Sequence, residues 1–426
     1  MNYEEAGKYL KNIQSFGISL GLERMKELCR RLRNPEKELS FIHVAGTNGK
    51  GSTAAYISSI LAVGGYLTGR YVSPAVFRYE ECIQYEDMRG VHYIDRELLA
   101  ELVTEVSAAA EEMVRDGWEH PTVFEIETAV SFLAFVRWQC RIVLLEVGLG
   151  GREDATNVVE HVIASVITPI SLDHTAVLGE TLEKIAEEKA GIIKPEGLVI
   201  TLQNDCRATA VIQKRADEEN ALMIVVRNED ITYISANLEG SVFSYKGENY
   251  RTSMPGRYQV SNACLAIETC RRLPKPFALD EEQIMLGIRM AQWRGRFEVV
   301  CPEPLVIIDG AHNPAGAEAL LASVKELLSG RTLHGIMGVF KDKDYETMVK
   351  IVAPIFRDVV TVTAPGNRGL DAGLLAEEWK KNLCPEVATA KTVNEALKKV
   401  LSHYREGEAV LIFGSLSLFK ELNWKV

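Results

Sequence analysis

The stretch that decides the fold is Phe41–Leu61, which reads FIHVAGTNGKGSTAAYISSIL. A short apolar strand runs into a loop with three glycines and one lysine, and a helix follows. Glycines let backbone N–H groups approach an anion, and a helix directs the positive end of its dipole toward the preceding loop. The stretch therefore predicts a phosphate-binding loop in an α/β protein.

The spacing of this loop differs from that of the common P-loop, in which a hydroxyl residue directly follows the Gly-Lys pair. Lys50 can reach the β- and γ-phosphates of a nucleotide as a point charge, but a glycine separates it from the next hydroxyl residue. The competing interpretation is a tight strand-to-helix turn whose glycines serve geometry alone. A Rossmann dinucleotide site is a poor fit because G-x-G-x-x-G is absent. We predict nucleotide contacts from seven consecutive residues: Gly46, Thr47, Asn48, Gly49, Lys50, Gly51 and Ser52.

The composition is that of an ordinary globular protein. The 426 residues are 47% hydrophobic and 25% charged, and a chain of this length predicts two or three domains. No apolar run approaches the roughly 20 residues that span a bilayer, and the charged N-terminus does not resemble a signal peptide. We therefore expect no membrane association.

Charge and cysteine usage further limit the class of protein to which the chain can belong. The eight scattered cysteines form no close C-x-x-C pair, which favours a reducing cytoplasm over a disulfide framework or zinc ribbon. The net charge of −11 argues against a nucleic-acid-binding protein. If the substrates are anionic, positive charge must be concentrated at the site.

Strand and helix patterns alternate along most of the chain, which predicts a largely parallel sheet. The segment 231–252 is different, since its short alternating runs and its KGEN turn predict an antiparallel hairpin. The alternation restarts after WRGRFE, so we place the domain boundary between residues 1–296 and 297–426. The predicted strands are 41–45, 142–147, 162–169 and 198–202, and the predicted helices are 52–63, 94–113, 125–138 and 182–190.

A transferred phosphate also needs Mg2+, which prefers oxygen ligands. Glu146 ends a buried strand beside a glycine turn, where an acidic residue is costly without a metal or an ion pair. Ser73 precedes a proline after another possible strand, although most such serines only form turns. His174 follows a third strand, and a lone histidine is more often structural, but strand ends are where α/β sheets bind ligands.

Taken together, these motifs resemble one family. VAGTNGKGST, Ser73-Pro74, EVGLGGREDATN, SLDHTAVLGETLEKIAEEKAGIIKP, WRGRFE and IDGAHNP occur in the order and spacing of folylpolyglutamate synthase and dihydrofolate synthase, within the Mur ligase superfamily. The resemblance covers nearly the whole chain. It implies a P-loop-type ATPase domain with a mostly parallel sheet, a smaller Rossmann-like α/β C-terminal domain, and a cytoplasmic monomer that binds ATP and two Mg2+ ions.

The resemblance also implies roles for residues of the first domain. Lys50 would hold phosphate, and Ser73 and Glu146 would bind one Mg2+, so that the hydroxyl missing after Lys50 comes from a separate strand end. His174 would bind a second Mg2+. Lys189 would carry a carbamate, although an unmodified helix lysine is the alternative. The acceptor side would include Asp154.

On the nucleotide side, Asn262 resembles an adenine-contacting residue and Arg296 an arginine that reaches the phosphates. Asp309 resembles a ribose-binding aspartate, with His312 close by; the competing interpretation of IDGAHNP is a helix-entry turn at Asn313-Pro314. The resemblance places ATP between two domains that close over it.

The implied reaction joins L-glutamate with ATP, through an acyl phosphate, to the carboxylate of a folate, as in tetrahydrofolylpolyglutamate synthesis. The alternative is addition of glutamate to dihydropteroate, or an enzyme with both activities. The chain departs from many relatives at Ala75, at Glu80–Ile83 and at Tyr258, which leaves the choice between the two acceptors open. A cell-wall Mur ligase is a second hypothesis, but it usually carries an additional N-terminal domain and the loop here begins about 45 residues into the chain. A regulatory or motor ATPase is a third hypothesis, and it gives no reason for the EVGLGGREDATN and EEKAGIIKP motifs.

Overall fold

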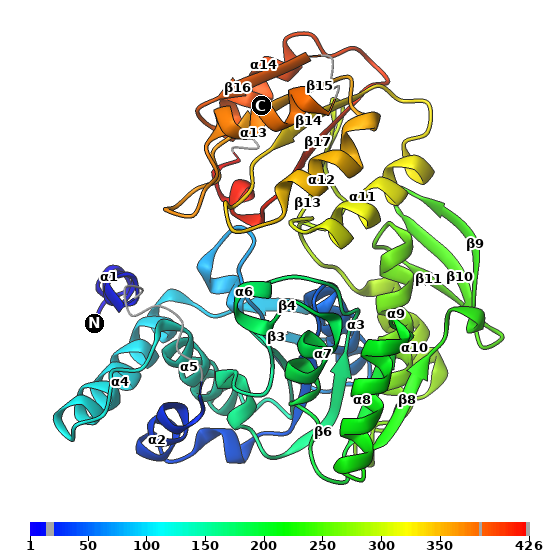
Figure 1. Ribbon diagram of the computed structural model, residues 1–426. Helices are drawn as coiled ribbons and strands as arrows, with labels where there is room; N and C mark the ends of the chain where they lie inside the picture. Colours follow the sequence, from blue (N-terminus) through cyan, green and yellow to red (C-terminus); the bar gives the residue numbers. More distant parts are fainter. Residues whose placement is uncertain (14–20, 383–385, 423–426) are drawn as a thin grey trace. The chain divides into compact units, whose positions relative to one another are not determined.

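The computed structural model describes residues 1–13, 21–382 and 386–422. These residues form two compact units (Figure 1). Unit 1 comprises Met1–Ala75, Tyr79–Asp230 and Asn262–Ala291, and unit 2 comprises Val76–Arg78, Ile231–Ser261 and Gln292–Val426. Unit 2 thus combines the C-terminal part of the chain with the separate segment Ile231–Ser261.

Unit 1 is built on an eight-stranded sheet with the order β4-β3-β2-β5-β1-β6-β7-β8. The strands β2, β5, β1, β6, β7 and β8 run parallel to one another, whereas β3 pairs antiparallel with β2 and with the edge strand β4. The predicted mostly parallel sheet is therefore confirmed. The strands are β1 (Phe41–Ala45), β2 (Thr68–Tyr71), β3 (Ile83–Asp87), β4 (Gly90–Tyr93), β5 (Ile142–Glu146), β6 (Val162–Ile167), β7 (Leu198–Leu202) and β8 (Leu222–Val226).

Helices cover both faces of this sheet. Glu86 of β3 accepts a hydrogen bond from Ser58 of α3, whereas Ile83 of the same strand packs in the core beneath α4 and α5. Because odd and even strand positions point to opposite faces, α3 covers one face of the sheet and α4 and α5 cover the other. The helices associated with unit 1 are α1 (Tyr3–Ile13), α2 (Glu23–Arg31), α3 (Lys50–Val63), α4 (Arg96–Arg115), α5 (Val123–Arg137), α6 (Thr175–Leu178), α7 (Leu182–Ala190), α8 (Cys206–Glu218), α9 (Arg257–Cys270), which begins in unit 2, and α10 (Glu281–Met290).

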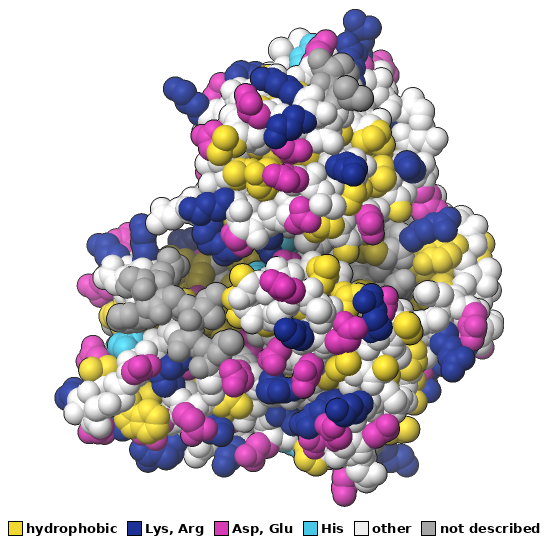
Figure 2. All heavy atoms as spheres, in the orientation of Figure 1, with side chains coloured by type: hydrophobic (Ala, Val, Ile, Leu, Met, Phe, Trp, Pro, Cys, Tyr) yellow, Lys and Arg dark blue, Asp and Glu magenta, His cyan; other side chains and the backbone are white. Residues whose placement is uncertain are grey.

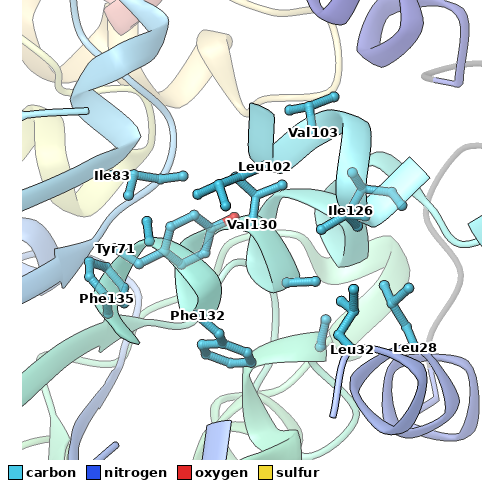
Figure 3. Packing of buried hydrophobic residues seen from close by; sticks show 14 of the residues in the cluster. Leu28, Leu32, Tyr71, Ile83, Leu102, Val103, Ile126, Val130, Phe132 and Phe135 are labelled. Carbon is cyan, nitrogen blue, oxygen red and sulfur yellow. The ribbon is translucent and has the colours of Figure 1, made fainter. Parts of the chain in front are cut away.

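Figure 3 shows the core on the α4–α5 face. Phe132 and Phe135 of α5 pack with Tyr71 of β2, and Leu28 of α2 closes the cluster from the side. All four side chains are fully buried. At about 25 cal/mol per Å2, burial of such apolar area is the main term that fixes the helices on the sheet.

Unit 2 contains a six-stranded sheet with the order β12-β13-β17-β14-β15-β16, in which only the edge pair β12–β13 is antiparallel. One apolar cluster lies under α11–α13 and a second lies under α14, so this sheet is also covered on both faces. Its elements are β12 (Glu298–Pro302), β13 (Leu305–Asp309), α11 (Pro314–Leu327), β14 (Leu333–Met337), α12 (Tyr345–Val352), β15 (Asp358–Val362), α13 (Ala372–Lys381), β16 (Glu386–Ala390), α14 (Val393–Leu401) and β17 (Ala409–Phe413). The predicted Rossmann-like C-terminal fold is confirmed.

The segment predicted as a hairpin is a three-stranded antiparallel sheet, so that prediction was incomplete. β9 (Ile231–Asn237), β10 (Gly240–Tyr245) and β11 (Glu248–Thr252) pair in the order β11-β10-β9. The KGEN turn joins β10 to β11, with Lys246 and Gly247 both at positive φ as a type I′ turn requires. The turn missed from sequence follows Asn237, where no Asn-Gly pair marks it.

The surface is mixed in charge. On the face shown in Figure 2, acidic and basic side chains are interspersed. In the part of the chain that the structure describes, no helix is both long enough and apolar enough to cross a bilayer.

Candidate active site

The glycine-rich loop lies between β1 and α3, at the carboxyl end of the parallel sheet. Gly49 is the N-cap of α3 with φ 89°, a conformation that favours glycine. A Cβ at Gly49 would lie 2.4 Å from Oδ1 of Asn262, and one at Gly46 would lie within 2 Å of Oγ1 of Thr168. Two of the loop glycines are therefore required by close approach as well as by backbone geometry.

Residues after β6 hold the loop in place. The Thr47 amide donates to the carbonyl of Pro169 at 2.9 Å, and the Thr47 hydroxyl donates to the carbonyl of Ser171 at 3.0 Å. The Ser171 amide in turn donates to Thr47 Oγ1 at 3.1 Å. These bonds pre-organise the backbone at the start of α3.

Two lysine amines converge on one carbonyl of this loop. Nζ of Lys189, on α7, donates to the Gly46 carbonyl at 2.8 Å, and Nζ of Lys50 donates to the same oxygen at 3.3 Å. Lys189 is 5% exposed. Burial, with the nearby Lys50 charge as the second cause, lowers the pKa of Lys189 to about 7, against the opposing effect of Asp173 and Asp154. A buried lysine with this pKa holds a large fraction of neutral, nucleophilic amine at neutral pH.

Glu146 ends β5, and Ser73 follows the neighbouring parallel strand β2. Tyr71 of β2 pairs with Leu145 of β5, so the residues just beyond them lie at the same edge of the sheet. Glu146 is 6% exposed, and its Oε1 lies 3.9 Å from Nζ of Lys50. Ser73 is half-buried and precedes a cis peptide bond to Pro74. A carboxylate and a hydroxyl at one sheet edge are suitable oxygen ligands for Mg2+.

Asp154 lies in a buried network. Its carboxylate accepts hydrogen bonds from the Leu149 amide at 2.8 Å, from the Thr156 amide at 3.1 Å and from the Thr156 hydroxyl. Burial raises the pKa of Asp154, although these hydrogen bonds oppose the rise. The Thr156 hydroxyl gives its single proton to Asp154, so Nε2 of His43, 2.9 Å from the Thr156 oxygen, must be the donor.

His174 lies in the loop after β6 and is the most solvent-exposed of the predicted metal ligands. Its backbone is left-handed with φ 51°, and 39% of its side chain is accessible. Nε2 lies 3.9 Å from Oδ1 of Asp173, whose side chain is largely buried. Solvent exposure leaves this imidazole accessible to a ligand.

In unit 2, Asp309 ends β13 and is 4% exposed. It accepts hydrogen bonds from the amides of Phe297 and Ala311, both at 2.8 Å, and from the Tyr258 hydroxyl at 3.2 Å. Burial raises the pKa of Asp309, and the nearby Arg296 charge is the main opposing effect. The carboxylate thus fixes three parts of unit 2.

Two further predicted residues lie beside Gly310. Nη1 of Arg296 donates to the Gly295 carbonyl at 3.0 Å, and a Cβ at Gly310 would lie 2.1 Å from that nitrogen. Nδ1 of His312 lies 2.8 Å from the Gly310 carbonyl oxygen. Asn313 caps α11 and Pro314 is its first residue, as the helix-entry interpretation predicts. The IDGAHNP turn therefore combines helix entry with a polar cluster.

The sequence motifs thus meet in two groups, one in each unit. In unit 1, Lys50, Glu146, Lys189 and Asn262 surround the glycine loop. The supporting residues His43, Thr156 and Thr168 were not predicted, because their contacts depend on strand register. Tyr258 stood out in the sequence only as a departure from relatives.

Comparisons with known proteins identify the family of this chain. The Mur ligase middle domain matches residues 44–270, and the Mur ligase glutamate ligase domain matches residues 295–416. The chain therefore belongs to the Mur ligase family, a class of ATP-dependent ligases.

Full-length relatives define the branch of that family. The chain is 34% identical to the dihydrofolate synthase/folylpolyglutamate synthase of Bacillus subtilis, over 99% of this chain and 98% of that one. The folylpolyglutamate synthase of Thermotoga maritima superposes with a TM-score of 0.83 at 32% identity, covering 100% and 99% of the two chains. Escherichia coli FolC in complex with DHPP and ADP superposes with a TM-score of 0.84 at 30% identity, covering 99% and 96%. Within the Mur ligases, the chain belongs with the folylpolyglutamate and dihydrofolate synthases.

Proposed function

We propose that the chain joins L-glutamate to the carboxylate of a folate, with ATP converted to ADP and phosphate. The observation that carries the proposal is the convergence of Lys50 and Lys189 on the Gly46 carbonyl, at the start of α3 and next to Glu146. A cationic, pre-organised loop beside a buried carboxylate fits the transfer of a phosphoryl group to an acidic acceptor.

The chemistry explains why ATP is needed. A carboxylate does not react with an amine at neutral pH, because its oxygen is a poor leaving group. Transfer of the γ-phosphoryl group forms an acyl phosphate, whose phosphate then leaves as the glutamate amine attacks the carbonyl carbon. The tetrahedral adduct loses a proton and collapses to an amide and phosphate.

We assign the nucleotide contacts to residues from both groups. Lys50 and the loop hold the phosphates, and Asn262, packed against Gly49, contacts the adenine. In unit 2, Arg296 serves the phosphates and Asp309 the ribose, with His312 next to them. A carboxylate and a triphosphate repel each other, by about 4 kcal/mol per pair of unit charges at 4 Å and an effective dielectric of 20, so these cations are needed.

The donor set fits Mg2+. Ser73 and Glu146 offer the oxygen ligands that Mg2+ prefers, at one sheet edge, and we assign them to one ion. We assign the accessible His174 to a second ion, to which it offers a ring nitrogen. When bound, the two ions neutralise the charge that develops on the transferred phosphoryl group. Lys50 already lies 3.9 Å from Glu146, so cation and carboxylate share this edge.

We propose that Lys189 is carbamylated. Its amine attacks CO2, a C–N bond forms and one proton leaves to solvent, which yields an anionic oxygen donor in place of a cation. The support is physical, since burial lowers the pKa of Lys189 to about 7 and so provides the neutral nucleophile. The alternative is an unmodified lysine that only holds Gly46, and a carbonyl resonance from 13C-labelled bicarbonate, lost in the Lys189→Met variant, distinguishes the two.

We assign Asp154 to the acceptor side, where its buried network gives it a fixed orientation. The departures from relatives near the acceptor have structural partners of their own. Glu80 accepts hydrogen bonds from Tyr3 at 3.2 Å and from Arg96 at 2.9 Å, and Ala75 is buried. The choice between tetrahydrofolate and dihydropteroate therefore rests on the acceptor assay.

The test compares both acceptors at fixed glutamate and MgATP. We expect glutamate-dependent ADP release with at least one acceptor, and loss of that release in Lys50→Ala. Lys184→Ala, an exposed position on α7, is the matched control and should retain full turnover. Near-normal turnover of Lys50→Ala, or ADP release that needs neither acceptor nor glutamate, would contradict the proposal.

We further propose that the enzyme acts as a cytoplasmic monomer. None of the seven described cysteines is in a disulfide bond, which fits a reducing compartment. Sedimentation at assay concentrations tests the oligomeric state.

A further inference from the structure

A cluster of polar residues lies at the amino-terminal edge of the six-stranded sheet, where none of the proposed ligase residues is found. His334 lies near the start of β14 and pairs with Asp358, the first residue of β15. His403 follows α14, and Glu408 directly precedes β17. Asp309, by contrast, ends β13, so the two sets lie at opposite ends of the parallel strands.

Two histidines of this cluster share the carboxylate of Asp358. Nδ1 of His334 lies 2.8 Å from Oδ2 of Asp358, and Nε2 of His403 lies 3.4 Å from the same oxygen. The three ligand atoms lie within 4.8 Å of one another, and among the described residues this is the one group of its kind. The other ring nitrogen of His334, Nε2, lies 2.9 Å from Oε2 of Glu408.

Burial leaves one acceptor atom of this cluster without a partner. His334 is fully buried, and Asp358 is 5% exposed. Oδ1 of Asp358 is buried and accepts no hydrogen bond from the residues that the structure describes. The two imidazoles contact the other oxygen of this carboxylate, Oδ2, so a metal ion shared by the three side chains would use acceptor capacity of Asp358 that the protein leaves unfilled.

We propose that His334, Asp358 and His403 bind one divalent transition metal ion of the Zn2+ type, and that Glu408 orients His334. Ligand atoms at about 2.0–2.1 Å from a tetrahedral ion lie about 3.3 Å apart, which the separations of 2.8 and 3.4 Å bracket. The contact from Glu408 to the distal nitrogen of His334 is the usual carboxylate–histidine–metal arrangement.

The ligand chemistry separates this site from the proposed magnesium sites. Two imidazoles and one carboxylate suit Zn2+, Co2+ or Ni2+, whereas Mg2+ prefers oxygen ligands and keeps much of its water. His403 is 45% exposed at its side chain, which gives the ion a path from solvent and leaves the fourth position to water.

Metal binding replaces a proton at the cluster. The ion takes the place of the Nδ1 proton of His334, which leaves to solvent, while the Nε2 proton stays on the bond to Glu408. The ion thus links the loop after α14 to the starts of β14 and β15, and should stabilise that edge of unit 2.

The test uses the full chain, stripped of metal with a chelator and then kept in saturating Mg2+ to fill magnesium sites. Titration with Co2+ should give the intense visible absorption of a tetrahedral ion, saturating at one equivalent, and Zn2+ should abolish that absorption. His403→Ala should lose the band, and Glu408→Gln should weaken Co2+ binding by about 10- to 100-fold. His161→Ala, an exposed histidine of unit 1, is the matched control and should behave as the unmodified chain does.

His403 is exposed and remote from the proposed ligase residues, so His403→Ala should fold and retain ligase turnover. Zn2+ should raise the melting temperature of the unmodified chain and of His161→Ala, and leave that of His403→Ala unchanged. A chain that develops no intense Co2+ band, or a band that persists in His403→Ala, would overturn the proposal and leave the cluster as a buried ion-pair network.

Discussion

The buried His43 predicts a specific acid sensitivity of unit 1. Its side chain is fully buried on β1, its Nε2 donates to Thr156, and its Nδ1 has no hydrogen-bond partner among the described residues. Burial, with the nearby Lys194 charge as a smaller cause, lowers the pKa of His43 from 6.5 to about 3. The folded chain therefore resists a protonation that the unfolded chain accepts.

The sign and size of the effect follow from linkage. Between pH 6.5 and about pH 3 the unfolded chain binds one more proton at this residue, so stability is full above pH 6.5 and falls as the pH falls. Each pH unit in this range corresponds to about 1.4 kcal/mol of unfolding free energy. His43 alone should therefore lower the free energy of unfolding by about 2 kcal/mol at pH 5 and by at most about 5 kcal/mol near pH 3.

His43→Gln removes the titration and keeps an N–H donor near Thr156. We expect the loss of unfolding free energy between pH 8 and pH 5 to be about 2 kcal/mol smaller in this variant than in the unmodified chain. Urea denaturation followed by circular dichroism at both pH values measures this difference. Any effect of the substitution on stability that does not depend on pH cancels in the comparison.

The exposed His161→Gln is the control and should follow the unmodified chain. Parallel pH profiles for His43→Gln and the unmodified chain would refute the reasoning, because they would mean that the imidazole is protonated in the folded state or reaches solvent.

Three other substitutions test the site. Lys189→Met should abolish turnover and yet raise the urea midpoint, because a buried amine is replaced by an apolar chain; the exposed Lys184→Met should change neither. Gly49 has φ 89°, and a Cβ there would lie 2.4 Å from Oδ1 of Asn262, so Gly49→Ala should lower the free energy of unfolding by more than about 1 kcal/mol and raise the KM for ATP. Gly65 has a similar φ of 84° and open space around it, so Gly65→Ala measures the backbone contribution alone. Tyr258→Phe removes one of the hydrogen bonds to Asp309 and should cost about 1 kcal/mol in urea denaturation while raising the KM for ATP but not for glutamate.

Much of the fold could be predicted from apolar patterns. The strands at Phe41–Ala45 and Leu198–Leu202 and the helix at Leu182–Ala190 have the predicted bounds, because buried parallel strands read as continuous apolar runs between turns. The antiparallel edge β2–β3 gave no such signal. Arg70 is buried there and donates to Gln84 of β3, so polar side chains occupy positions that a periodicity argument expects to be apolar.

The motifs of the candidate site could be predicted from the sequence, but the residues that pack and hydrogen-bond around them could not. Glycines, Lys50 and Glu146 stand out because their residue types are unusual at strand ends. The contact from His43 to Thr156 joins residues 113 positions apart and depends on how β1 and β5 are paired, and a single sequence does not encode that register visibly. The deep burial of Lys189 was likewise invisible, since its helix has an ordinary mixed pattern.

The supporting residues show how unit 1 combines stability with the proposed chemistry. Lys189, Asp154 and His43 each lie where burial disfavours their charged form, and the pKa of each is shifted in the direction that burial predicts. A fold selected for stability alone would replace such groups by apolar ones, because unpaired polar burial costs free energy. Asp154 and Lys189 instead remain near the glycine loop, held by defined donors and acceptors. That cost is accounted for if a neutral amine must react and an oriented carboxylate must face an acceptor, which is why Lys189→Met should yield a more stable and inactive protein.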